Sequence, residues 1–191
     1  MEPFFSLPHS RYCVYWYQQS VADFAKSDLA AEEQLAAELQ KRTLDYVGTG
    51  EQQSGAGHDA NYSANSTKGS YNGEFYRDCG QGNEGYVEYT LTIPEERYNE
   101  LAQSGDALTV MCRFTVADKG RKAKVSVDGT EVANVTIPSN VANKDTKGFY
   151  NDEYRLPRKV AYGTNGKLKR RFVFRIEPAE NGTMCPGLYY L

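Results

Sequence analysis

Apolar residues alternate with polar ones along most of the second half of the chain, a pattern typical of half-buried β-strands. The alternation predicts strands in YVEYTLTI (86–93), ALTVMCRFTV (107–116), KAKVSV (122–127) and EVANVTI (131–137). The last two flank Asp128-Gly129, a dipeptide typical of a tight hairpin turn. We expect these four segments to be successive antiparallel strands.

A further strand is predicted in LKRRFVFRIE (168–177), with Phe172, Phe174 and Ile176 facing inward because side chains of a strand alternate between its faces. Near the N-terminus, SRYCVYWY (10–17) also indicates a strand. The period then changes to a helical one over residues 21–43, where Ser20 and Asp23 have the spacing of an N-terminal capping box. This is the one helix that the pattern predicts.

Residues 48–85 form a long stretch dominated by Gly, Ser, Asn and Asp, which predicts a loop region. Loops of this length are usually linkers or functional surface. Because aromatic residues are embedded in it, we expect this loop to fold onto the strands. The embedded aromatics are Tyr62, Tyr71, Phe75 and Tyr76.

The composition supports a mostly β fold, since 15 Tyr and 8 Phe suit pleated, half-buried surfaces. We therefore expect an antiparallel β-sandwich, jelly-roll-like and similar to a carbohydrate-binding module, with one N-terminal helix.

The net charge of -3 disfavours nucleic acid as a partner, because binding nucleic acid requires a surplus of Lys and Arg. No apolar run approaches the ~20 residues that cross a bilayer, so no membrane partner is expected.

Four cysteines, Cys13, Cys79, Cys112 and Cys185, lack the close spacing of a structural zinc site, so no metal and no cofactor are expected. Cys112 lies on the apolar face of its predicted strand and is interpreted as a buried free thiol. A disulfide is possible, but the spacing gives no support for one.

Two groups of residues invite a catalytic interpretation, and in both cases it is weak. The segment 45–53 with His58 and Asp59 gathers a carboxylate, amides and an imidazole, but turn-stabilising polar residues explain it better. In GEFYRDCG (73–80) the carboxylates of Glu74 and Asp78 share one strand face, as in some glycosidases. Such pairs are common by chance, so we assign no catalytic residue.

A sugar-binding surface needs an exposed aromatic ring to stack on the sugar, and charges or amides to hold its hydroxyl groups. The predicted loop supplies these types, although its tyrosines could equally cap the core. The candidate carbohydrate-binding residues are His58, Asp59, Tyr62, Tyr71, Tyr76, Arg77 and Asp78.

The order of several segments resembles the C-terminal region of the beta-L-arabinofuranosidase-like glycoside hydrolases, glycoside hydrolase family 127 and its relatives. The matching segments are PFFSLPHSRYCVYW, the helix, DYVGTGEQQ with a following His-Asp, GEFYRDCG, KVSVDGTEVA and AENGTMCPGLYYL. In that family a helical barrel carries the active site and β-sandwich domains follow it. The resemblance implies that the catalytic domain is absent from this chain.

The resemblance implies that residues 1–44 are a strand and a linking helix, the remnant of a preceding domain. It implies that residues 45–191 are a β-sandwich domain. We expect a non-catalytic accessory domain of an enzyme acting on arabinose-containing or related plant glycans. Its partners would be the missing catalytic domain and a glycan, in the periplasm or outside the cell. The alternative is a purely structural domain that braces the barrel or a homodimer.

Overall fold

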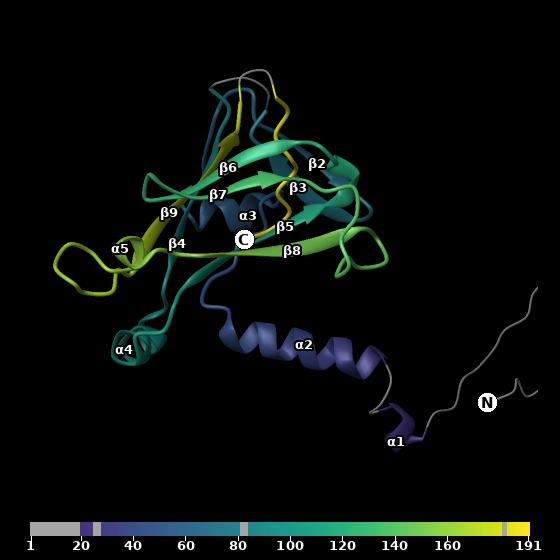
Figure 1. Ribbon diagram of the computed structural model, residues 1–191, viewed down its shortest axis with the longest axis horizontal. Coiled ribbons are helices and arrows are strands. Elements are labelled where there is room, and N and C mark those ends of the chain that lie inside the picture. The colour runs from purple at the N-terminus through teal and green to yellow at the C-terminus, as the bar shows by residue number, and fades with distance from the viewer. Residues whose placement is uncertain (1–19, 25–27, 81–83, 181–182) are drawn as a thin grey trace, which may run out of the picture. The chain divides into compact units, whose positions relative to one another are not determined.

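The computed structural model describes residues 20–24, 28–80, 84–180 and 183–191 (Figure 1). The predicted strand at residues 10–17 lies outside these ranges. The chain divides into two units, residues 1–43 and residues 44–191. In the described residues of the first unit, helices α1 (Val21–Phe24) and α2 (Asp28–Arg42) fall within the predicted helical region.

The predicted N-terminal cap is confirmed at α1. The backbone N–H of Asp23 donates to Ser20 Oγ at 3.1 Å, and that hydroxyl donates to Asp23 Oδ2 at 2.6 Å. The serine thereby satisfies a backbone N–H that has no partner within the helix.

The second unit contains a five-stranded sheet in the order β1-β4-β9-β6-β7, in which every neighbouring pair is antiparallel. The bounds of its strands are β1 (Asn61–Tyr62), β4 (Val87–Thr92), β6 (Lys122–Val127), β7 (Thr130–Thr136) and β9 (Arg171–Pro178). Phe172, Phe174 and Ile176 of β9 are buried, as predicted from their alternation.

A second layer is built from two antiparallel strand pairs, β2 (Thr67–Tyr71) with β3 (Glu74–Asp78), and β5 (Thr109–Thr115) with β8 (Phe149–Arg155). The C-terminal residues 188–191 connect the two pairs. Leu188 exchanges two backbone hydrogen bonds with Arg77 of β3, while Tyr189 and Tyr190 bond to Arg113 of β5.

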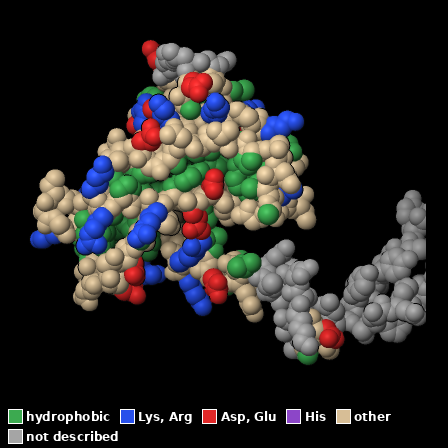
Figure 2. All heavy atoms as spheres, in the orientation of Figure 1, with side chains coloured by type: hydrophobic (Ala, Val, Ile, Leu, Met, Phe, Trp, Pro, Cys, Tyr) green, Lys and Arg blue, Asp and Glu red, His purple; other side chains and the backbone are tan. Residues whose placement is uncertain are grey.

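One hydrophobic core fills the space between the two layers. Val125 and Phe174 of the five-stranded sheet and Cys112 and Phe114 of β5 are all fully buried in it. Figure 2 shows hydrophobic side chains in a band between the charged residues of this unit. The predicted fold class, a mostly β antiparallel sandwich, is confirmed.

The pairing of strands differs from the predicted succession. The Asp128-Gly129 hairpin is confirmed, with positive φ angles of 50° and 72° that suit a two-residue turn. However, β4 pairs with β1 and β9, and β5 pairs with β8, so β6 and β7 are the one sequential pair among the four predicted strands. The chain crosses from one layer to the other between β4 and β5 and again between β5 and β6, so these consecutive strands do not pair. The alternation of apolar and polar residues does not encode such crossings.

The prediction that residues 48–85 form a loop region is wrong. Within its described part the chain forms helix α3 (Gln52–Ala56) and strands β1, β2 and β3. Asn72 and Gly73, with φ angles of 46° and 88°, turn β2 back onto β3. This Asn-Gly dipeptide is the same hairpin signal as Asp128-Gly129, but the polar flanks of β2 obscured it.

Helices that the sequence pattern did not predict also form. Helix α4 (Glu95–Ser104) begins after Pro94, carries two glutamates in its first turn and ends at Gly105, whose φ is 68°. These are ordinary helix boundary signals. Two short helices, η1 (Val116–Asp118) and α5 (Arg158–Ala161), occur in connections between strands.

Cys79 and Cys185 form a disulfide, which the spacing of the cysteines left possible without supporting it. They lie 106 residues apart in sequence, so only the fold brings them together. The prediction of a buried free thiol at Cys112 is confirmed. Among the described residues there is no group of three potential metal ligands, and none of their helices is long and apolar enough to span a bilayer.

Candidate functional site

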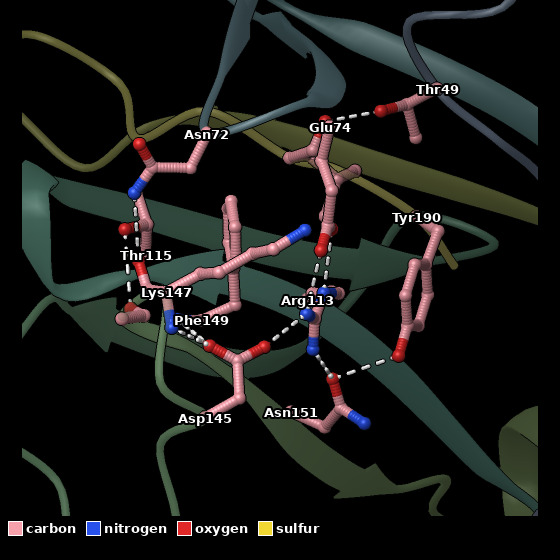
Figure 3. A network of polar contacts seen from close by, with 12 residues as sticks. Thr49, Asn72, Glu74, Arg113, Thr115, Asp145, Lys147, Phe149, Asn151 and Tyr190 are labelled. Atoms are coloured by element: carbon pink, nitrogen blue, oxygen red, sulfur yellow. Dashed lines mark hydrogen bonds and ion pairs between the residues drawn. The ribbon is translucent and has the colours of Figure 1, made fainter. Parts of the chain in front are cut away.

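Arg113 of β5 lies at the centre of a polar cluster on the face of the second layer that points away from the core (Figure 3). Its Nε and Nη2 atoms each lie 2.8 Å from a different carboxylate oxygen of Glu74. Nη2 also donates to Asp145 Oδ2 at 2.6 Å, and Nη1 donates to Asn151 Oδ1 at 3.3 Å. Tyr190 completes the cluster by donating its hydroxyl to Asn151 Oδ1 at 2.9 Å.

Two aromatic rings flank the guanidinium group, Phe149 on one side and Tyr190 on the other (Figure 3). The Arg113 Cζ atom lies 4.7 Å from the ring centre of Phe149 and 5.5 Å from that of Tyr190. Each ring contacts a second, exposed ring. Tyr71 packs edge-on against Phe149 with centroids 5.9 Å apart, and Tyr46 packs against Tyr190 at 5.4 Å.

The exposure of these side chains distinguishes the surface from the framework beneath it. Tyr46 is 51% exposed and Tyr71 39%, whereas Phe149 is fully buried. The Arg113 side chain is only 14% exposed. Tyr46 and Tyr71 therefore lie at the solvent-exposed edge of a framework whose centre, Arg113 and Phe149, is largely or fully buried.

Two turns hold the cluster in place. Asp145 Oδ1 accepts the backbone N–H groups of Lys147 and Phe149, each at 2.9 Å, which fixes its carboxylate beside Arg113. The Asn72 side chain at the β2–β3 turn donates to the Lys147 carbonyl at 3.0 Å. This bond fastens the tip of one strand pair to the loop of the other.

Arg113 and Asp145 are ionised at neutral pH. Burial lowers the pKa of Arg113, but the hydrogen bonds that Arg113 donates to Glu74 and Asp145 outweigh this effect and raise the pKa further above the physiological range. Burial likewise raises the pKa of Asp145, and the backbone N–H of Phe149 and the Arg113 guanidinium overcome this effect and lower it. Arg113 and Asp145 therefore face each other as a charged pair.

The cluster contains one of the seven candidates from the sequence, Tyr71. His58 is instead a partly buried loop residue, with Nδ1 2.6 Å from the Ser54 carbonyl oxygen and Nε2 3.0 Å from Asp45 Oδ1. Asp59 is exposed, and its Oδ2 lies 2.5 Å from Arg171 Nη2. The alternative interpretation of His58 as a hydrogen-bonded loop residue fits these contacts.

The other four candidates have structural contacts. Arg77 stacks its guanidinium on the Tyr62 ring at 3.7 Å, and Tyr76 packs against Tyr189 at 5.5 Å. Asp78 is 6% exposed and accepts hydrogen bonds from the Thr67 N–H and hydroxyl and from the Gly80 N–H. These contacts link the β2–β3 hairpin to Tyr62 of β1 and to Tyr189 of the C-terminal segment.

Most of the remaining members of the cluster were missed because they come from distant segments. Tyr46, Arg113, Asp145, Asn151 and Tyr190 are separated by up to 144 positions, and only Asp145 and Asn151 lie near each other in sequence. Glu74 was singled out, but only as a carboxylate considered for catalysis. One signal was available: Arg113 is the charged residue on the outward-facing side of an otherwise apolar strand. A large charged side chain at such a position calls for partners from neighbouring strands.

The chain matches the sequence profile of a family described as "Family of unknown function (DUF6805)" over residues 38–189. No curated protein sequence matches it. Its fold is similar to a family 35 carbohydrate binding module from Clostridium thermocellum, with 14% identity, a TM-score of 0.43 and coverage of 69% of this chain and 88% of that one. A family 35 module from Paenibacillus barcinonensis has 12% identity, a TM-score of 0.41 and coverage of 76% and 95%.

Proposed function

The chain belongs to the DUF6805 family, a family of unknown function, and we propose that it is a non-catalytic accessory domain that binds carbohydrate at the cluster around Arg113. The observation that carries this proposal is the pair of exposed tyrosine rings, Tyr46 and Tyr71, beside an ordered set of charged and amide groups. Sugar rings offer a C–H face to an aromatic ring and hydroxyl groups to polar partners, so both kinds of group are needed together.

The polar groups beside the rings suit hydroxyl groups, which both donate and accept hydrogen bonds. Arg113 can only donate, so the Asn151 atom that faces it must be the side-chain oxygen. The Asn151 amide nitrogen has no hydrogen-bond partner among the described residues and points away from the guanidinium in Figure 3. The carboxylates of Glu74 and Asp145 supply acceptors next to it.

The acidic residues considered for catalysis are engaged in structural contacts, which supports a non-catalytic role. Glu74 forms the two-point ion pair with Arg113, and Asp78 is buried among donors from Thr67 and Gly80. A general acid must contact the substrate directly. The oxygens of both carboxylates are instead engaged by donors from the protein itself.

The parent enzyme in this proposal is a glycoside hydrolase acting on arabinose-containing or related plant glycans, as the ordered segments of the sequence suggest. An extracellular or periplasmic location is supported by the Cys79–Cys185 disulfide, because disulfides persist in oxidising compartments.

The proposal is tested by calorimetric titration of the full chain with arabinose-containing oligosaccharides and plant polysaccharides. We expect saturable binding that weakens by about tenfold or more in Tyr46→Ala and in Tyr71→Ala, since each removes an aromatic contact. Phe75→Ala is the matched control. Phe75 is 59% exposed but lies on the opposite strand face from its neighbour Glu74.

Binding that is equally weakened by Phe75→Ala would place the ligand elsewhere. The absence of binding to the whole panel by folded protein would refute the proposal and leave a structural role that braces the catalytic barrel or a dimer. Turnover of an aryl glycoside by the chain would contradict the non-catalytic part.

A further inference from the structure

The hydrogen bonds of Arg113 leave little of its guanidinium group available to a ligand. An arginine has five N–H groups. One on Nε and one on Nη2 bond to Glu74, the second on Nη2 bonds to Asp145, and one on Nη1 bonds to Asn151. A single N–H of Nη1 therefore remains, which is too few for the two-point contact by which arginine binds a carboxylate.

The charges around the exposed rings show no positive surplus. The two negative charges of Glu74 and Asp145 balance the two positive charges of Arg113 and Lys147. Lys147 contacts the cluster through its backbone, and its ammonium group is exposed. Burial is the largest cause of the raised pKa of Tyr46, and the nearby negative charge of Glu51 is the second. A carboxylate ligand would thus lie near Glu51, Glu74 and Asp145, which repel it.

Apart from the Lys147 ammonium group and one N–H of Arg113, whose charges Glu74 and Asp145 balance, the groups that remain free are uncharged. They include the Asn151 amide nitrogen and the hydroxyl groups of Tyr46 and Tyr71, for which the described residues provide no hydrogen-bond partner. Neutral donors of this kind bond to sugar hydroxyls without the electrostatic attraction that an acidic sugar requires.

We infer that the Arg113 cluster binds neutral, hydroxyl-bearing sugars and discriminates against uronic acids. This inference rests on the proposed carbohydrate-binding function and specifies the class of glycan. Arg113 acts in it as a positioning residue, which fixes Asn151 and the ring of Phe149 under Tyr71.

The test compares neutral and acidic polysaccharides on the full wild-type chain by calorimetry or affinity electrophoresis. Arabinan, arabinoxylan and galactan serve as neutral ligands, and polygalacturonate and glucuronoxylan as acidic ones. Fully methyl-esterified polygalacturonate is the matched control, because it keeps the backbone of the acidic polymer and lacks its charge. We expect at least one neutral polymer to bind about tenfold or more tightly than every acidic one.

The binding of the neutral polymer should be unchanged between about 50 mM and about 500 mM NaCl, since an uncharged ligand has no Coulomb attraction to be screened. It should also weaken by about tenfold or more in Tyr71→Ala. Tighter binding of polygalacturonate than of its methyl ester, or steep weakening by salt, overturns the inference while the proposed function stands. Neutral binding that Tyr71→Ala leaves unchanged overturns it by placing the ligand elsewhere, and no binding to any polymer refutes the proposed function itself.

Discussion

Arg113 and Glu74 meet through two parallel hydrogen bonds of 2.8 Å, Nε to Oε2 and Nη2 to Oε1. The pair joins β5 of one strand pair to β3 of the other, across the C-terminal segment that lies between them. The contact that orders the candidate binding surface is therefore also a contact that holds the second layer together. Changes at this pair should alter stability and binding together.

Glu74→Gln should destabilise the protein by about 1.5–3 kcal/mol, because it removes a charge-assisted two-point contact and turns an amide N–H toward the guanidinium. Glu95→Gln is the matched control. Glu95 pairs with Arg170 at 3.5 Å on an exposed surface, where ion pairs contribute about 0–1 kcal/mol. Urea unfolding of both variants measures the difference, and equal losses of stability would show that the Arg113 pair is energetically no more than a surface contact.

Gly50→Ala should be strongly destabilising, because an added Cβ would lie 2.5 Å from Phe75 Cβ and 2.7 Å from the backbone carbon of the same residue. The backbone of β3 cannot yield as a flexible side chain would, so a cost of about 1–3 kcal/mol is expected. Gly57→Ala, where the nearest atom lies at 3.7 Å, should be neutral or stabilising by up to about 1 kcal/mol. Thermal unfolding tests both, and a Gly50→Ala variant as stable as Gly57→Ala would contradict the close approach.

The strands were predictable where one face is buried and the other is not. In β6 the burial alternates residue by residue, and its predicted bounds of 122–127 match the observed ones. In β2 no side chain is buried, so the apolar period that reveals a strand is missing although the strand forms. Its stability comes from the Asn72-Gly73 turn and from pairing with β3.

The candidate site was largely unpredictable for a related reason. Tyr71 was identified because aromatic residues stand out in a polar segment, but Arg113 and Asn151 become neighbours only when β5 pairs with β8 in one particular register. The alternation pattern is the same for any partner strand, so it does not specify that pairing. The same limit applies to Cys79 and Cys185, whose approach depends on the path of the whole sandwich.

Removal of the Cys79–Cys185 disulfide should destabilise the protein by about 2–5 kcal/mol, since the bond closes a loop of roughly a hundred residues in the unfolded chain. The double variant Cys79→Ser/Cys185→Ser, compared with wild type by urea unfolding, measures the loss. Cys112→Ser is not a suitable control because Cys112 is fully buried. Reduction of the wild-type protein should instead reproduce the effect of the double variant, and a loss below about 1 kcal/mol in both would contradict it.

His58 has hydrogen-bond acceptors at both ring nitrogens, the Ser54 carbonyl at Nδ1 and the Asp45 carboxylate at Nε2. A neutral imidazole carries a single N–H, so only the protonated ring donates to both. Burial, the largest influence on the pKa of His58, lowers it, but the hydrogen bonds to Ser54 and Asp45 and the charges of Asp45 and Asp59 raise it above its ordinary value overall.

The raised pKa means that the folded state binds a proton more tightly than the unfolded chain. The stability that His58 contributes is therefore fully present below about pH 6.5 and is lost as the pH rises through the folded pKa. Urea unfolding of wild type and His58→Gln from about pH 5.5 to about pH 8.5 should show a stability difference that shrinks with rising pH. A difference that grows with pH would mean that His58 is neutral in the folded protein.

Because Asp45 precedes Tyr46 and also accepts the Thr92 N–H at 2.7 Å, loss of the His58 contact should loosen the segment that presents Tyr46. Glycan affinity should then fall over the same pH range in wild type, and remain constant in His58→Gln.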